Sequence, residues 1–330
     1  MTTAPSTAKM SGSLAKEITS YLVLAFGISW VLLIGAIKLG LGEECLNIGV
    51  AGPAIAALIL SRRKYENRKP FSRGRLLWLS CPWVLCWIVI CLHYLWRNAG
   101  ALEIRLNPLL LIPAAVPAWI LSGACSSNEG VRKFVRRIAH VPNRWSLFAL
   151  LCLPVMLGIP SILAYALHAK LISPQGHDSA MASMADGFVF FLFNLLFVGT
   201  AEEPGWRGFL LDRLQQKFSP LASSLLVWFP WAVWHVPLDY YRPVRFDWAT
   251  YVLLRVVFLI PLTIILTWFY NRSRRSIQAT MIFHATMNTV PFVMPYYQPA
   301  WFLLFVFTGY AVISDKMWSR QSLTSTLNAS

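Results

Sequence analysis

A series of long apolar runs covers most of this 330-residue chain. A backbone that crosses a bilayer core has no water to bond, so each crossing needs about 20 mainly apolar residues folded as a helix. Hydrophobic residues make up 57% of the chain and charged residues 13%, whereas about a quarter of a soluble domain is charged. The sequence therefore predicts an all-α, polytopic transmembrane helical bundle.

Ten apolar runs could each form a span, and some are short enough to merge or to re-enter the same face. We therefore expect about eight to ten crossings. None of the runs alternates with the two-residue period of a β-strand. The runs cover residues 18–38, 46–61, 76–96, 106–124, 146–169, 187–211, 221–237, 248–270, 277–294 and 300–314.

The basic residues behind the formal net charge of +15 are distributed as in a membrane protein and not as in a nucleic-acid-binding protein. Basic residues gather in alternate loops, at 62–75, 132–144, 213–217 and 272–275, which the positive-inside rule places in the cytoplasm. Both termini are then cytoplasmic, and the first run is expected to be an uncleaved helix in the cell (inner or plasma) membrane. Nucleic-acid binding is disfavoured because the basic loops are short, flank apolar runs and contain no recognisable binding module.

Ionisable residues inside apolar runs are the informative positions, because each costs at least a few kcal/mol unless it is paired or functional. They concentrate in three segments of the C-terminal half, GTAEEPGWRGFL, WFPWAVWHVP and IFHATMN. His93 lies near the end of its run and is expected to contact the interface or a neighbouring backbone carbonyl. Arg255 lies close enough to its helix start to snorkel. The six cysteines form no CxxC pair, which favours packing over a redox or thiolate-metal role.

The first segment predicts a kinked polar site. Glu203 and Arg207 stand four residues apart on one helix face and can form an ion pair, while Glu202 is rotated by about 100° from Glu203 and has no basic residue one turn away. Pro204 lacks an N–H, so a carbonyl one turn earlier loses its partner. Glycines at 199, 205 and 208 allow other segments to approach closely.

The second segment contains His235. The third contains His284, which stands four residues before Asn288. Each of these side chains alone is best explained by a hydrogen bond between helices. Together with Glu202 they provide what peptide hydrolysis needs, since a carboxylate can take a proton from water and donors can stabilise an oxyanion.

These three motifs resemble those of the CPBP intramembrane protease family, also called the CAAX protease and bacteriocin-processing or Abi family. EExxxR, a His on the next hydrophobic helix and a later HxxxN all match, and EEPGWRGFL is close to the common bacterial form. Trp231 departs from the pattern, because the family usually has Phe or Tyr four residues before the His. The resemblance divides the chain into an N-terminal transmembrane region (1–186), a protease-like core (187–310) and a cytoplasmic tail (311–330).

The resemblance implies roles for six residues. Glu202 would be the general base on water with His235 assisting, and His284 and Asn288 would polarise the substrate carbonyl. Glu203 and Arg207 would support the site. It also implies a membrane-embedded or lipidated peptide as substrate and no tightly bound metal.

Three alternatives stay open. Zinc is a minority hypothesis, because Glu and His are also zinc ligands although HExxH is absent. A secondary transporter would also place charges and a broken helix near the midplane. A membrane scaffold or immunity factor without protease activity could keep the polar residues for packing.

Overall fold

The computed structural model describes residues 7–40, 43–63, 73–97, 110–138, 144–172, 184–241 and 248–320. Throughout these ranges the chain is dominated by helices, as the sequence predicted. The loop at 64–72, the segment at 173–183 and the end of the tail, 321–330, lie outside the described residues.

The N-terminal region and the C-terminal half are both helical. The first part comprises α1 (Thr7–Lys38), α2 (Glu43–Val50), α3 (Gly52–Arg63), α4 (Arg73–Arg97), α5 (Leu111–Ser122), η2 (Gly123–Cys125), α6 (Glu129–Arg136) and α7 (Arg144–Ala166). The second comprises α8 (Met184–Phe193), η3 (Asn194–Gly199), α9 (Thr200–Glu203), η4 (Pro204–Leu211), α10 (Asp212–Leu214), α11 (Pro220–Trp234), α12 (Val236–Tyr241), α13 (Trp248–Arg272), α14 (Ile277–Val293), η5 (Gln298–Trp301) and α15 (Phe302–Ser314).

Four helical stretches in the described residues are long and apolar enough to cross a membrane: Gly12–Lys38, Arg144–Ala166, Gly187–Leu214 and Trp248–Arg272. Shorter apolar helices accompany them at Gly52–Arg62, Leu79–Leu95, Leu111–Cys125, Pro220–Trp234 and Gln298–Ser314. The protein is thus a multi-pass membrane protein. The run at 46–61 is not one helix, because it breaks at Ala51 between α2 and α3.

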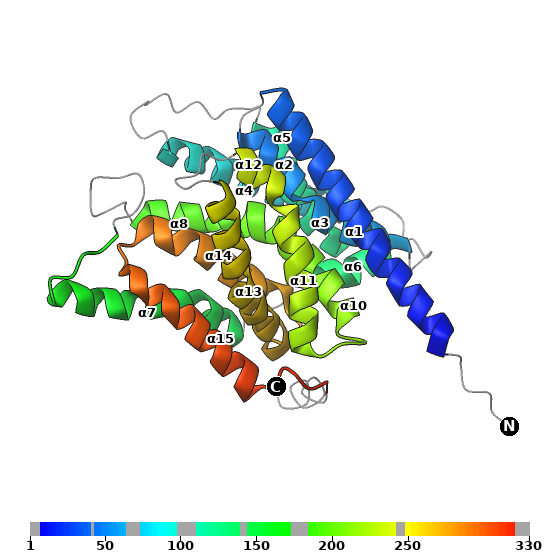
Figure 1. Ribbon diagram of the computed structural model, residues 1–330. Helices are drawn as coiled ribbons and strands as arrows, with labels where there is room; N and C mark the ends of the chain where they lie inside the picture. Colours follow the sequence, from blue (N-terminus) through cyan, green and yellow to red (C-terminus); the bar gives the residue numbers. More distant parts are fainter. Residues whose placement is uncertain are drawn as a thin grey trace.

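Helices α13 and α14 cross the middle of the bundle, with α1 along one edge and α7 and α15 on the opposite side (Figure 1). Helix α3 packs against α1 and against the α9–η4 segment. The largest fully buried side chains include Trp206, Trp231, Trp234, Arg207 and Tyr21. Several of the largest buried side chains therefore lie in or beside the EExxxR segment.

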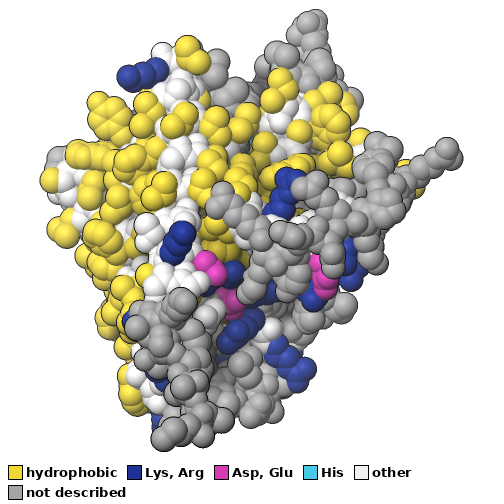
Figure 2. All heavy atoms as spheres, turned by 90° about the vertical axis from the view of Figure 1, so that its right-hand side faces the viewer, with side chains coloured by type: hydrophobic (Ala, Val, Ile, Leu, Met, Phe, Trp, Pro, Cys, Tyr) yellow, Lys and Arg dark blue, Asp and Glu magenta, His cyan; other side chains and the backbone are white. Residues whose placement is uncertain are grey.

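Figure 2 shows how polarity divides one face of the molecule. Hydrophobic side chains cover its upper part, while the described Lys, Arg, Asp and Glu side chains gather mainly in the lower half. This separation is what a bilayer requires of a helical bundle, because charged groups must stay at its ends.

Candidate active site

The EExxxR segment lies on one continuous helical stretch whose α-helical hydrogen bonding is interrupted twice. Short π-helices, η3 and η4, flank the α-helical turn α9 that carries Glu202 and Glu203. The second π-helix begins at Pro204, whose ring removes one backbone donor. The sequence predicted a disturbance at Pro204, and the structure shows its form: a local widening of the helix, a feature that is frequent at functional sites.

Glu203 forms the predicted ion pair. Its Oε1 accepts a hydrogen bond from Arg207 Nη1 at 2.8 Å, and both side chains are completely buried. The same oxygen lies 2.8 Å from His284 Nδ1. Glu203 is therefore held by a cation from its own helix and by an imidazole from α14.

Glu202 is also buried but has a different kind of partner. Its Oε2 accepts a hydrogen bond from Trp231 Nε1 of α11 at 2.8 Å. Within the part of the chain that the structure describes, this neutral donor makes the only hydrogen bond to the Glu202 carboxylate. Both carboxylates keep an oxygen without a hydrogen bond among the described residues, since Glu203 Oε2 also has no partner. They differ in the kind of partner: Glu203 Oε1 contacts a cation and an imidazole, whereas Glu202 Oε2 accepts only from a neutral indole.

The hydrogen bonds of the two histidines determine which ring nitrogen carries hydrogen. His235 Nδ1 lies 2.7 Å from the backbone oxygen of Trp231. A carbonyl oxygen only accepts, so Nδ1 donates, and Nε2 of the neutral ring is an acceptor. By the same argument His284 Nδ1 donates to the Glu203 carboxylate. His284 can donate from Nε2 only when its ring carries a second proton.

The structure brings five of the six predicted residues into one network. Glu202 and His235 both contact Trp231, and the His284 ring lies 5.7 Å from the Trp231 ring. Asn288 is half-buried one turn beyond His284 on α14, and no contact between it and the other five is seen among the described residues. His235 follows the last residue of α11, at the end of the helix.

Two comparisons with known proteins bear on this network. The sequence model for the Rce1-like type II CAAX prenyl endopeptidases matches residues 184–290, which include all six predicted site residues. Over these residues the chain is similar to the Rce1-like family. The chain is also similar to CAAX prenyl protease 2 of Methanococcus maripaludis, with 29% identity over 196 residues that cover 54% of this chain and 70% of the relative.

These similarities confirm the predicted resemblance and support a protease, that is, a peptidase and hydrolase. They favour a protease over the transporter and scaffold alternatives. The roles of the individual residues stay predictions.

The EExxxR segment is enclosed by close helix packing at two glycines. A Cβ at Gly205 would lie 2.5 Å from the backbone carbon of Pro53 in α3, and one at Gly208 would lie 2.6 Å from Ile277 Cδ1 in α14. The sequence predicted close approaches at these glycines, and the structure identifies the partners. Helix α3 of the N-terminal region therefore forms one wall of the active-site segment.

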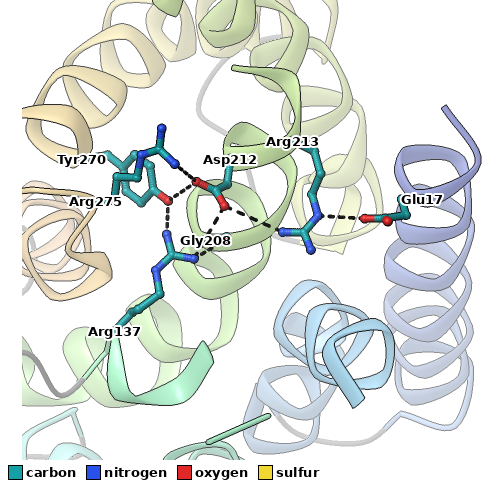
Figure 3. Close-up of polar contacts among 7 residues, drawn as sticks. All are labelled: Glu17, Arg137, Gly208, Asp212, Arg213, Tyr270 and Arg275. Atoms are coloured by element: carbon teal, nitrogen blue, oxygen red, sulfur yellow. Dashed lines mark hydrogen bonds and ion pairs between the residues drawn. The ribbon is translucent and has the colours of Figure 1, made fainter. Parts of the chain in front are cut away.

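An Asp212 cluster fixes the end of the same segment (Figure 3). Asp212 Oδ1 accepts hydrogen bonds from the Tyr270 hydroxyl and from Arg275 Nη1, both at 3.1 Å. Arg137 contacts the Tyr270 hydroxyl and donates to the Gly208 carbonyl at 3.2 Å. Residues from three predicted cytoplasmic loops thus meet at one end of the bundle.

Charge balance keeps this cluster intact. Burial lowers the pKa of the Arg137 guanidinium, but Tyr270 and Asp212 raise it by more, so the net shift is upward. Arg213 extends the network by donating from Nε to Glu17 of α1 at 3.3 Å (Figure 3). The cluster ties α1, α6 and α13 to the end of the active-site segment.

Two isolated ionisable residues, His93 and Arg255, have partners that the sequence did not identify. His93 is buried and stacks on Phe193, with ring centroids 3.9 Å apart. Arg255 forms an ion pair with Asp239 at 2.6 Å. A carboxylate on α12, which the sequence analysis did not consider, compensates the Arg255 charge.

The described residues contain no group of three or more His, Cys, Asp or Glu side chains placed to share a metal ion. Glu203 Oε1 is already bonded to Arg207 and His284. The expectation that the enzyme works without a tightly bound metal stays a prediction.

Proposed function

We propose that this endopeptidase hydrolyses a peptide bond in a prenylated CAAX-type protein at the membrane, using a water molecule that Glu202 activates. The difference between the two adjacent carboxylates is the observation that carries the mechanism. Glu203 is bonded to Arg207 and His284, whereas Glu202 receives one hydrogen bond from an uncharged indole. A general base must be able to accept a proton, and the carboxylate without a cationic partner is better suited to do so.

The substrate class is supported by the name of the archaeal relative, CAAX prenyl protease 2, and by the position of the site. Glu202 and Glu203 lie within the membrane-spanning stretch Gly187–Leu214. A peptide bond reaches such a site when the substrate is itself anchored in the bilayer, and a prenyl chain supplies an anchor of this kind.

The proposed reaction balances as a hydrolysis. Glu202 takes a proton from water while His235 Nε2 accepts the second O–H of that water as a hydrogen bond. The hydroxide adds to the scissile carbonyl carbon, and the oxygen that becomes negative is stabilised by the Asn288 amide and, when the His284 ring carries a second proton, by its Nε2–H. The C–N bond then breaks, and the proton on Glu202 passes to the leaving amine.

The test is Glu202→Gln, which keeps the volume of the side chain and its ability to accept from Trp231 but removes the base. We expect kcat for cleavage of a farnesylated CAAX peptide to fall by about 10²- to 10⁴-fold. Glu129→Gln is the matched control, because that carboxylate is exposed and pairs with Lys133 on α6. Wild-type rates in Glu202→Gln would refute the mechanism, and equal cleavage of the unprenylated twin peptide would refute the substrate class.

A further inference from the structure

Trp231 is the side chain that connects the separate parts of the site. It lies on α11, is almost completely buried, and stands one turn before His235. Its indole N–H donates to Glu202, and its backbone carbonyl accepts from His235.

The indole N–H fixes one oxygen of the general base. A glutamate side chain has several rotatable bonds, and a catalytic base is efficient only when it is held close to its productive position. The 2.8 Å bond from Nε1 occupies Oε2 and leaves Oε1 of Glu202 for the water. Because the donor is uncharged, it orients the carboxylate without the strong stabilisation that a guanidinium would give.

The indole ring also holds the supporting cation. The guanidinium carbon of Arg207 lies 4.2 Å from the centroid of the Trp231 ring, within the range of a cation–π contact. The ring therefore contacts Arg207 with its face and Glu202 with its N–H edge. This arrangement keeps the cation associated with Glu203 while a neutral group faces Glu202.

We propose that Trp231 is a positioning residue that orients Glu202 through its indole N–H. The proposal rests on the proposed role of Glu202 as general base. It assigns a function to the one motif position at which this chain departs from the Phe or Tyr pattern. A phenylalanine at this position could preserve the ring face for Arg207 but would have no hydrogen to donate.

The first variant is Trp231→Phe, which removes the N–H and keeps an aromatic ring. We expect kcat to fall by about 10- to 100-fold, with KM changed less than threefold, because the loss is in orientation of the base and not in binding. Trp268→Phe is the matched control. Its indole is likewise buried, lies near an arginine (Arg272) and has no hydrogen-bond acceptor among the described residues.

The second variant removes only the N–H. Replacing Trp231 with 3-benzothienylalanine exchanges the indole nitrogen for sulfur and keeps the two fused rings, so folding and packing should be preserved. We expect the same fall in kcat as in Trp231→Phe. This variant decides the question if Trp231→Phe fails to fold.

The outcomes separate the positioning role from the base role. Wild-type kcat in the benzothienyl enzyme overturns the proposal, even when Glu202→Gln is inactive. A fall of the same size in Trp268→Phe also overturns it, because the cause would then be loss of core packing. Activity in Glu202→Gln instead refutes the mechanism on which the proposal depends.

Discussion

Removing the charge of Glu203 should weaken the fold and not only the chemistry. Glu203→Gln keeps an oxygen that can accept from Arg207 but leaves the guanidinium without a counter-ion where both side chains are completely buried. Breaking a buried ion pair costs about 3–5 kcal/mol, because the remaining charge is desolvated and unpaired. In a domain of 150–250 residues each kcal/mol shifts the Tm by about 2–4 °C, and the lower value applies to this larger chain. We therefore expect the Tm of Glu203→Gln to fall by about 6–10 °C.

The measurement is thermal unfolding of purified protein in one detergent, followed for wild type, Glu203→Gln and Glu202→Gln. Glu202→Gln is the informative comparison, since the neighbouring carboxylate has a neutral partner and its loss should change the Tm by no more than about 2 °C. The double variant Glu203→Gln with Arg207→Met removes both charges and should recover part of the lost stability. Equal Tm values for the two single variants would refute the assignment of different environments to the two glutamates.

Three further predictions concern packing, topology and metal content. Gly205→Ala forces a Cβ to within 2.5 Å of α3 and should destabilise by about 1–3 kcal/mol in thermal unfolding, whereas Gly35→Ala, which meets nothing within 4 Å, should not. In a cysteine-free background, single cysteines near positions 68 and 136 should be shielded from an impermeant thiol reagent in intact cells, and one near 178 should be labelled. Labelling at 68 would contradict the prediction that the basic loops are cytoplasmic. Elemental analysis should find no stoichiometric transition metal, and about one zinc per chain lost together with activity would reassign His235 and His284 as ligands.

The fold class and the Glu203–Arg207 pair could be predicted from sequence because both depend on local spacing. Apolar runs of membrane length give helices, and residues four apart on a helix meet. The break at Ala51 was not predicted, although the Gly52–Pro53 dipeptide that follows it is a turn signal. A Cβ at Gly52 would lie 2.1 Å from Ser29 Oγ, so the tight contact of this turn with α1 depends on tertiary packing.

The partners of Glu202 and His284 could not be predicted, because they come from other helices. Spacing indicated that Glu202 has no basic neighbour on its own helix, and it gave no indication that an indole 29 residues later would supply a donor. Trp231 stood out in the sequence only as a departure from a family pattern. The available signal was that a buried tryptophan needs a partner for its N–H. Asp239 was missed for a related reason, since its cation, Arg255, lies on a different helix.

The charges of the site explain why two glutamates are adjacent. The carboxylates of Glu202 and Glu203 and the guanidinium of Arg207 together carry one net negative charge in a buried site, and an unpaired buried charge is costly. When Glu202 takes a proton from water and hydroxide adds to the carbonyl, that negative charge moves to the oxyanion and the net charge of the site is unchanged. The Glu203–Arg207 pair cancels itself and can stay fixed throughout. Hydrolysis at this site therefore requires a charge to move over a short distance, and the helix α14 residues His284 and Asn288 are placed to receive it in the proposed mechanism.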